Sequence, residues 1–143
     1  MINEDAKPLW LFRQSAVVPW RIHDRQIQVL LVTTANGKHW TIPKGVLEFG
    51  YTPWDSALKE AREEAGVSGR VGRNKLGEYE YKKWGGTCHV DVYPLEVLEV
   101  MRSWPEMRKR KRRWYTLDKC AKKIKHGGLL PVLNKLPRYL KQI

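Results

Sequence analysis

One stretch of 23 residues, 45–67, constrains the fold of this chain more than any other part of the sequence. It reads G-V-L-E-F-G-Y-T-P-W-D-S-A-L-K-E-A-R-E-E-A-G-V, which is a glycine turn followed by a helical pattern. Thr52 suits the N-cap, Pro53 suits the first helical position, and Gly66 suits the left-handed residue that ends a helix. The stretch therefore predicts a helix over residues 53–65.

The predicted helix has two different faces. Its apolar face consists of Trp54, Ala57, Leu58, Ala61 and Ala65, which share one sector at 100° per residue. Glu60, Glu63 and Glu64 gather in another sector. Because like charges on one helix face repel each other, we expect a cation beside them, and a hard divalent metal is the natural candidate. The alternative is a solvent-exposed acidic face, which is common on helices.

The glutamates and the glycine turn together predict a metal site for hydrolysis of phosphates. Mg²⁺ prefers oxygen ligands and is usually shared with substrate phosphates, whose charge it screens while it lowers the pKa of water. Gly45 lets the backbone approach closely, so that its carbonyl can add a ligand. We therefore expect Glu60, Glu63 and Glu64 to be catalytic and metal-binding, with Gly45 as a further ligand and Mg²⁺ or Mn²⁺ as the ion.

Charge is the strongest compositional signal, because the chain carries a net +12. This charge predicts an anionic partner, which is a nucleic acid, a membrane surface or a small polyphosphate. No run of 18 apolar residues is present, so we expect no membrane span, and the first residues lack a signal-peptide pattern. Cys88 and Cys120 have no metal-ligand spacing. We expect a cytoplasmic protein and a single domain over residues 1–143.

A run of six consecutive cations, residues 108–113, follows the predicted strands. Arginine binds phosphate oxygens with two parallel hydrogen bonds, so we expect Arg110 and Arg112 to bind substrate, together with Lys44 and Arg13. The alternatives are a solvated charge run and a nucleic-acid-binding patch.

Strands are predicted on both sides of the helix. Residues 26–34 are typical of a buried strand, whereas Pro19 predicts a strand at an edge or a bulge of the sheet. Glycines 85–86 mark a hairpin turn, and two further helices are predicted over residues 117–125 and 130–141. This order of elements predicts an α+β fold in which a mixed β-sheet lies between helices.

Stretch 45–67 resembles the Nudix box, usually written G-x5-E-x7-R-E-U-x-E-E-x-G-U, where U is an aliphatic residue. The matching positions are Gly45, Glu60, Ala61, Glu63, Glu64, Gly66 and Val67. Tyr51 stands where the box has its first glutamate, and Lys59 stands where it has an arginine. In the family the arginine orients the catalytic glutamates by ion pairing, and lysine keeps the charge but loses the bidentate fork. The resemblance therefore implies a supporting role for Lys59.

A second stretch extends the resemblance. The residues Trp104, Pro105 and Glu106, followed by Arg110, Arg112, Arg113 and Trp114, are similar to the W-P-E…R…R-W stretch of the diphosphoinositol polyphosphate phosphohydrolase-like branch. The resemblance implies a Nudix-type α/β/α sandwich with a mixed β-sheet and the catalytic helix packed beside it. It also implies Mg²⁺-dependent hydrolysis of a phosphoanhydride bond in an inositol pyrophosphate or a dinucleoside polyphosphate. Family members often add a carboxylate from outside the box, and Glu80, before the hairpin turn, is our choice.

Two other functions stay open at the level of sequence. The net charge also fits an RNA 5′-end pyrophosphohydrolase. The departures at Tyr51 and Lys59 also fit a Nudix domain that binds anions or nucleic acid without catalysis. We favour an enzyme acting on a small polyphosphorylated substrate, because the three helical glutamates remain.

Overall fold

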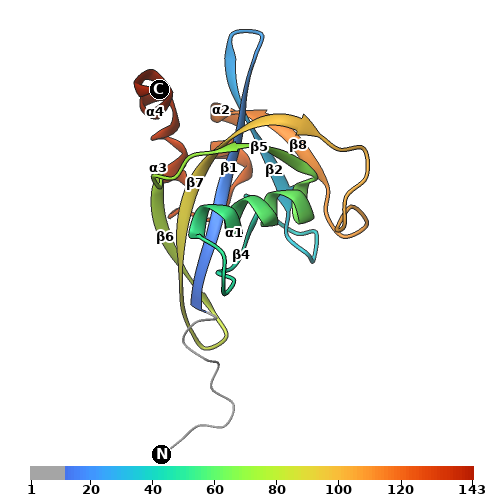
Figure 1. Ribbon diagram of the computed structural model, residues 1–143, viewed down its shortest axis with the longest axis vertical. Helices are drawn as coiled ribbons and strands as arrows, with labels where there is room; N and C mark the ends of the chain where they lie inside the picture. Colours follow the sequence, from blue (N-terminus) through green and yellow to red (C-terminus); the bar gives the residue numbers. More distant parts are fainter. Residues whose placement is uncertain (1–11) are drawn as a thin grey trace, which may run out of the picture.

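The computed structural model describes residues 12–143, and its strands form one eight-stranded mixed sheet (Figure 1). The strands are β1 (Arg13–His23), β2 (Gln26–Thr33), β3 (Trp40–Thr41), β4 (Lys44–Val46), β5 (Val67–Val71), β6 (Gly77–Lys83), β7 (Gly86–Val100) and β8 (Arg112–Thr116). The helices are α1 (Pro53–Glu60), which continues as a π-helical segment (Ala61–Ala65), then α2 (Leu117–Lys123), α3 (Leu130–Leu133) and α4 (Leu136–Gln142).

Strand β1 lies in the interior of the sheet. One of its sides runs parallel to β7, and the other pairs antiparallel first with β4 and then with β2. Pro19 falls between these last two pairings, on the side where Val17 N donates to Pro43 O. Because alternate residues of a strand direct their nitrogens to the same side, the missing N–H of Pro19 costs no ladder hydrogen bond. Of the two predicted positions for Pro19, an edge or a bulge of the sheet, the edge is therefore wrong, because β1 has partners on both sides.

Strand β7 is the longest strand, with 15 residues, and it divides its free side between two partners. Its first half pairs with β6, and its second half pairs with β5. The turn between β6 and β7 consists of Trp84 and Gly85, which both have positive φ, at 55° and 74°. Two consecutive positive φ values are typical of the tight turn that joins antiparallel strands. The predicted hairpin is confirmed.

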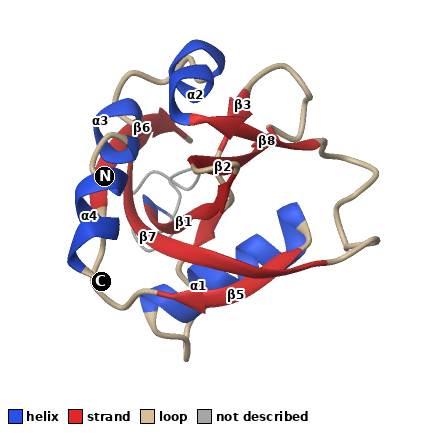
Figure 2. Ribbon diagram, turned by 90° about the horizontal axis from the view of Figure 1, so that it is seen from above, coloured by secondary structure: helices blue, strands red, loops and turns tan. Residues whose placement is uncertain are grey.

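Helices cover the sheet from two sides, so the predicted α+β sandwich is confirmed (Figure 2). On one side, α1 and the π-helical segment bury Ala57, Ala61 and Ala65 against strand residues such as Val17 and Leu95. On the other side, the C-terminal helices bury their apolar residues against the alternate strand positions, with Ala16, Val18, Val92, Leu129, Leu133 and Leu136 in one cluster. Neighbouring residues of β1 therefore face different cores, as the period of two requires.

Two of the predicted helices differ in form from those observed. The box helix spans the predicted residues, but its last turn is π-helical and ends at Gly66, which has φ +64°. Residues 130–141 form α3 and α4 instead of one helix, since Pro137 lacks the N–H that a continuous helix would need there. Within residues 12–143, no helix is both long and apolar enough to span a membrane.

Candidate active site

The close contact between β4 and the box helix is the centre of the site. A Cβ on Gly45 would overlap the carboxylate of Glu60, so the absence of a side chain is what allows this contact. Gly45 pairs with Ser15 of β1, which fixes the position of its backbone in the sheet. The helix therefore presents the carboxylate of Glu60 directly to the backbone that the sequence predicted as a metal ligand.

The carboxylate of Glu64 is buried in the same region. Its Oε2 accepts a hydrogen bond from the backbone N–H of Lys44 at 3.0 Å, and its Oε1 lies 3.3 Å from Nη2 of Arg110. Only 4% of the Glu64 side chain is exposed. The structure thus holds two carboxylates, Glu60 and Glu64, against consecutive residues of β4.

Both carboxylates are electrostatically costly in the absence of a cation. Burial raises the pKa of Glu60 to about 8, and the charges of Glu64 and Glu63 act in the same direction. Burial also raises the pKa of Glu64 to about 7, although Arg110 and the backbone N–H of Lys44 oppose the shift. A divalent cation between these groups would favour their ionised forms, so the donor set suits a hard metal ion.

Glu63 forms an ion pair with Lys59 on the same helix. The Lys59 amine lies 2.6 Å from Oε1 of Glu63 and 2.9 Å from Oε1 of Glu48. Hydrogen bonds to these two carboxylates raise the pKa of Lys59, so that it stays charged. Lys59 thus joins the helix to the loop before it, and its supporting role in the site stays a prediction.

Arg112 occupies a structural position, in disagreement with the prediction that it binds substrate. Its Nη1 donates to Ala65 O at 2.9 Å and to Gly66 O at 3.2 Å, and its Nη2 donates to Met101 O at 2.6 Å. The guanidinium also stacks 3.8 Å from the ring centroid of Trp104. Two of these bonds go to the carbonyls of Ala65 and Gly66 at the C-terminal end of the box helix, and the third joins that end to Met101, which follows β7.

Arg110 is also engaged within the protein. Besides its contact with Glu64, it donates from Nε to Glu106 Oε1 at 3.0 Å and from Nη1 to Thr33 O at 3.0 Å. The loop that carries it lies beside the end of the box helix, where Glu106 N donates to Glu63 O (Figure 1). Arg110 therefore positions and neutralises Glu64, and substrate binding through its guanidinium stays a prediction.

The sequence did not identify Glu48 and Glu106 as members of the site. Glu106 belongs to the Trp104-Pro105-Glu106 triplet, and its charge adds to the pKa increases of Glu60 and Glu64. That triplet was the feature of the sequence from which the place of Glu106 in the site could have been predicted. Glu48 has no comparable signal, since only the fold of the loop brings it to Lys59.

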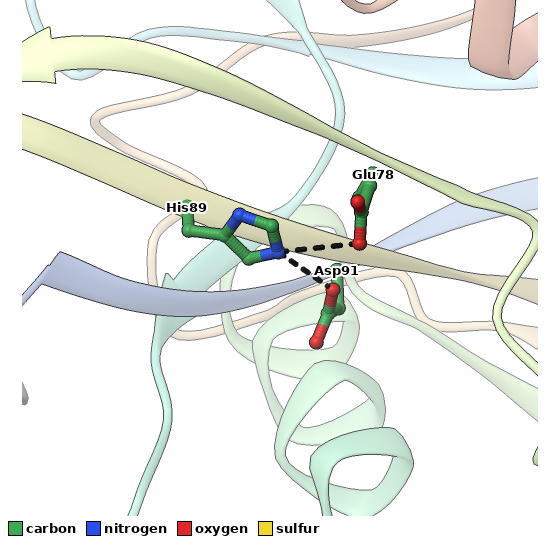
Figure 3. A group of neighbouring side chains, drawn as sticks. All are labelled: Glu78, His89 and Asp91. Atoms are coloured by element: carbon green, nitrogen blue, oxygen red, sulfur yellow. Dashed lines mark hydrogen bonds and ion pairs between the residues drawn. The ribbon is translucent and has the colours of Figure 1, made fainter.

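Glu80, our predicted extra carboxylate, lies beside a different cluster, formed by Glu78, His89 and Asp91; Figure 3 shows these three residues. Glu80 lies 3.6 Å from Nδ1 of His89, whose Nε2 lies 3.3 Å from Glu78 and 3.1 Å from Asp91. Within residues 12–143, Glu78, His89 and Asp91 are the group whose possible ligand atoms all lie within 4.8 Å of one another.

This cluster is separate from the box glutamates. The register places Gly45, Ser15 and Asp91 side by side on three strands, which puts Asp91 about 10 Å from Gly45 across the sheet. The amine of Lys75 already bridges Glu78 at 2.6 Å and Asp91 at 3.2 Å. The cluster therefore reads as an ion-pair network on the β6–β7 hairpin, and the structure does not bring Glu80 to the box.

A cleft of about 460 Å³ opens on the other side of β4. The side chain of Lys44 lies in this cleft, 5.4 Å from the ring centroid of Tyr81. Burial lowers the pKa of Lys44, and Glu64 opposes this effect. The remaining walls consist of Thr34, His39, Trp40, Thr41, Tyr79, Lys83, Lys125 and His126. Lys44, the residue before Gly45, therefore shares this cleft with aromatic rings and with two further lysines, Lys83 and Lys125.

Arg13, the last predicted substrate-binding residue, is exposed at the start of β1. Its carbonyl accepts a hydrogen bond from Leu47 N, so it lies beside the loop that follows β4. Its role in binding substrate stays a prediction.

Comparison with known proteins identifies the family. Residues 12–135 match the family profile described as "NUDIX domain". The chain belongs to the NUDIX domain family. As a family member it carries the box on the glycine turn and the helix described above, with Tyr51 and Lys59 as its departures.

Individual relatives agree with this assignment. The chain is 35% identical over 115 residues to "Nudix hydrolase 16, mitochondrial" of Arabidopsis thaliana, covering 75% of this chain and 63% of the relative. It is 33% identical over 102 residues to "Diphosphoinositol polyphosphate phosphohydrolase 3-beta" of Bos taurus, covering 69% of this chain and 61% of the relative. The chain thus spans less than two thirds of the length of these relatives.

The fold is similar to that of solved NUDIX structures. A crystal structure of a C. elegans Ap4A hydrolase binary complex superposes with a TM-score of 0.76 at 21% identity, covering 92% of this chain and 98% of that chain. At this identity the comparison supports the fold, and the site must be argued from the residues of this chain.

Proposed function

We propose that this chain hydrolyses a phosphoanhydride bond in a substrate that contains a diphosphate, with Mg²⁺ as its metal ion. The observation that carries the proposal is the pair of carboxylates, Glu60 and Glu64, packed against the backbone of Gly45 and Lys44. Their raised pKa values mark a position where a cation is favourable. A purely structural helix face would gain nothing from burying two like charges.

The residues that would hold the metal are Glu60, Glu64 and the carbonyl of Gly45. A bound Mg²⁺ supplies charge neutralisation at the phosphates and acidifies water, and Mn²⁺ offers the same chemistry. Glu63 supports this arrangement through Lys59, which also fastens the loop by its ion pair with Glu48. Glu106 lies next to the site and is the extra carboxylate that we now favour over Glu80.

The chemistry of the cleft suggests what the rest of the substrate looks like. Lys44, Lys83 and Lys125 offer three positive charges to a phosphate chain, while Trp40 and Tyr81 offer aromatic faces. This combination favours a substrate in which a phosphate chain is joined to a flat ring, such as a dinucleoside polyphosphate. Similarity to a protein named diphosphoinositol polyphosphate phosphohydrolase supports an inositol pyrophosphate as the second candidate.

The decisive experiment compares Glu64→Gln with Glu99→Gln, which removes an exposed carboxylate of β7 outside the site. Phosphate release is measured with Mg²⁺ or Mn²⁺ on a panel of dinucleoside polyphosphates, inositol pyrophosphates and nucleotide sugars. We expect Glu64→Gln to lower kcat at least about a hundredfold, because a metal site supplies several kcal/mol of transition-state stabilisation. Glu99→Gln should retain the activity of the unaltered protein.

Two results would contradict the proposal. Full metal-dependent turnover by a folded Glu64→Gln variant would remove the metal-site assignment. Absence of turnover on every member of the panel would instead support a NUDIX domain that binds anions without catalysis.

A further inference from the structure

The net charge of this chain is confined to its last third. Residues 1–101 contain 13 lysines and arginines and 13 carboxylates, so they are neutral overall. Residues 102–143 contain 14 lysines and arginines and only two carboxylates, Glu106 and Asp118, which accounts for the whole +12. The box glutamates and most of the sheet therefore lie in a neutral segment, and the excess charge belongs to the loop before β8, to β8 and to the residues that follow it.

Four of these cations form a continuous surface, which we call the α2 face. Lys119, Lys122 and Lys123 are exposed on α2 at positions i, i+3 and i+4, which lie on one side of a helix. Arg113 of β8 is also exposed and lines the same groove, which has a volume of about 550 Å³. The groove is thus bordered by four positive charges on two neighbouring elements.

Within residues 12–143, the four cations of the α2 face form no salt bridge. Among the salt bridges formed by residues 12–143, the last third contributes a single cation, Arg110, which pairs with Glu64 and Glu106. Asp118, the carboxylate nearest in sequence to the α2 lysines, takes part in none of them. Like charges in close proximity repel each other, so this face is electrostatically unfavourable until an anion binds.

Aromatic rings lie among these cations. Trp114 and Tyr115 line the groove, the guanidinium of Arg21 lies 4.1 Å from the ring centroid of Trp114, and Lys123 lies 5.8 Å from that of Tyr115. Tyr115 is buried and Trp114 is half-buried, so the groove offers its cations to a phosphate backbone and not its rings to the bases. A positively charged groove that follows the backbone is a feature of surfaces that bind single-stranded nucleic acid. A lipid surface fits less well, because the large exposed apolar residues lie outside β8 and α2.

We propose that the α2 face binds the sugar–phosphate backbone of single-stranded RNA. This surface is distinct from the metal site, since none of its four cations contacts Glu60, Glu64 or the cleft beside Lys44. The proposal therefore concerns a docking function that does not depend on which phosphoanhydride the protein hydrolyses.

Fluorescence anisotropy with a labelled twelve-nucleotide oligouridine tests the proposal. The oligonucleotide carries a 5′-hydroxyl, so that no terminal phosphate competes for the metal site. Four phosphate contacts to a single strand predict a slope of log K against log salt of about −2.8, or about fiftyfold weaker binding at 200 mM than at 50 mM salt. The triple variant Lys119→Gln, Lys122→Gln, Lys123→Gln should retain a slope of only about −0.7.

A matched control removes the same charge elsewhere. Arg70→Gln, Arg73→Gln and Lys82→Gln together neutralise three exposed cations outside the groove and should leave binding and its slope unchanged. Hydrolysis of the small substrate should be unchanged in both variants, which shows that each is folded. If both variants bind the oligonucleotide equally weakly, binding depends on net charge alone and the proposal is overturned.

Two further outcomes would also overturn it. One is unaltered protein that does not bind the oligonucleotide at 50 mM salt. The other is an α2 variant that still binds RNA but no longer binds vesicles with 30% phosphatidylserine, which would assign the face to an anionic membrane surface.

Discussion

Replacement of Arg112 by alanine distinguishes a structural role for this side chain from a role in substrate binding. The variant loses three hydrogen bonds to the carbonyls of Ala65, Gly66 and Met101, together with the stacking contact on Trp104. A hydrogen bond from a charged donor contributes about 1.5–3 kcal/mol, and a cation–π contact about 0.5–2 kcal/mol. Since the three bonds share one guanidinium and are not additive, we expect the unfolding free energy to fall by about 3–5 kcal/mol.

Urea unfolding followed by circular dichroism measures this change. Arg113→Ala is the matched control, because the neighbouring side chain is exposed and should change the unfolding free energy by less than about 0.5 kcal/mol. Arg112→Lys keeps the charge without the planar fork and should give an intermediate loss, which remains measurable if the alanine variant does not fold. An Arg112→Ala variant with unaltered stability and only a raised KM would refute the reasoning and restore the substrate-binding prediction.

Three further predictions concern the box. Gly45→Ala should displace the Glu60 carboxylate and abolish metal-dependent turnover, while circular dichroism shows a folded protein. Retained turnover would show that the close approach of Gly45 and Glu60 is not needed for activity. With EDTA, the melting temperature should fall as pH rises from about 4.5 to 8. The folded protein favours the protonated form of Glu60, whose pKa is raised to about 8, so protonation stabilises the fold fully only below the pKa of the unfolded chain. Glu60→Gln should reduce this pH dependence, and an equal fall in that variant would exclude Glu60 as its cause. Lys59→Gln should lower kcat by releasing Glu63 and Glu48, with at most about 1 kcal/mol lost in urea unfolding, whereas Lys59→Arg should retain activity; equal kcat values would argue against the positioning role.

Local chemistry determined the box helix and its faces. Thr52 accepts a hydrogen bond from Asp55 N at 3.1 Å, Pro53 begins the helix, and Gly66 ends it in the left-handed conformation, as the sequence predicted. These interactions join residues within a few positions of each other, so spacing alone reveals them. The same holds for the turn before β7 and for the net charge, which needs no fold to be counted.

Partners that lie far apart in the sequence were decided only by the tertiary structure. Arg112 bonds to Ala65 across 47 residues, and Arg110 bonds to Thr33 across 77 residues. A run of cations looks uniform in the sequence, yet the fold directs Arg110 and Arg112 inward and leaves Arg113 exposed. Side chains in a strand alternate between faces, but only the packing of neighbouring elements decides what each face meets.

Glu80 and Pro19 illustrate the same limit. Glu80 has the right chemistry for a metal ligand, but the β6–β7 register directs it to His89. A proline cannot donate a hydrogen bond to a neighbouring strand, but Pro19 lies where the partner of β1 changes from β4 to β2, so no ladder hydrogen bond is lost there. The sequence by itself determined the helix, its three glutamates and the glycine beneath them. The tertiary structure decided which charges face that helix, because long-range pairing has no fixed spacing along the chain.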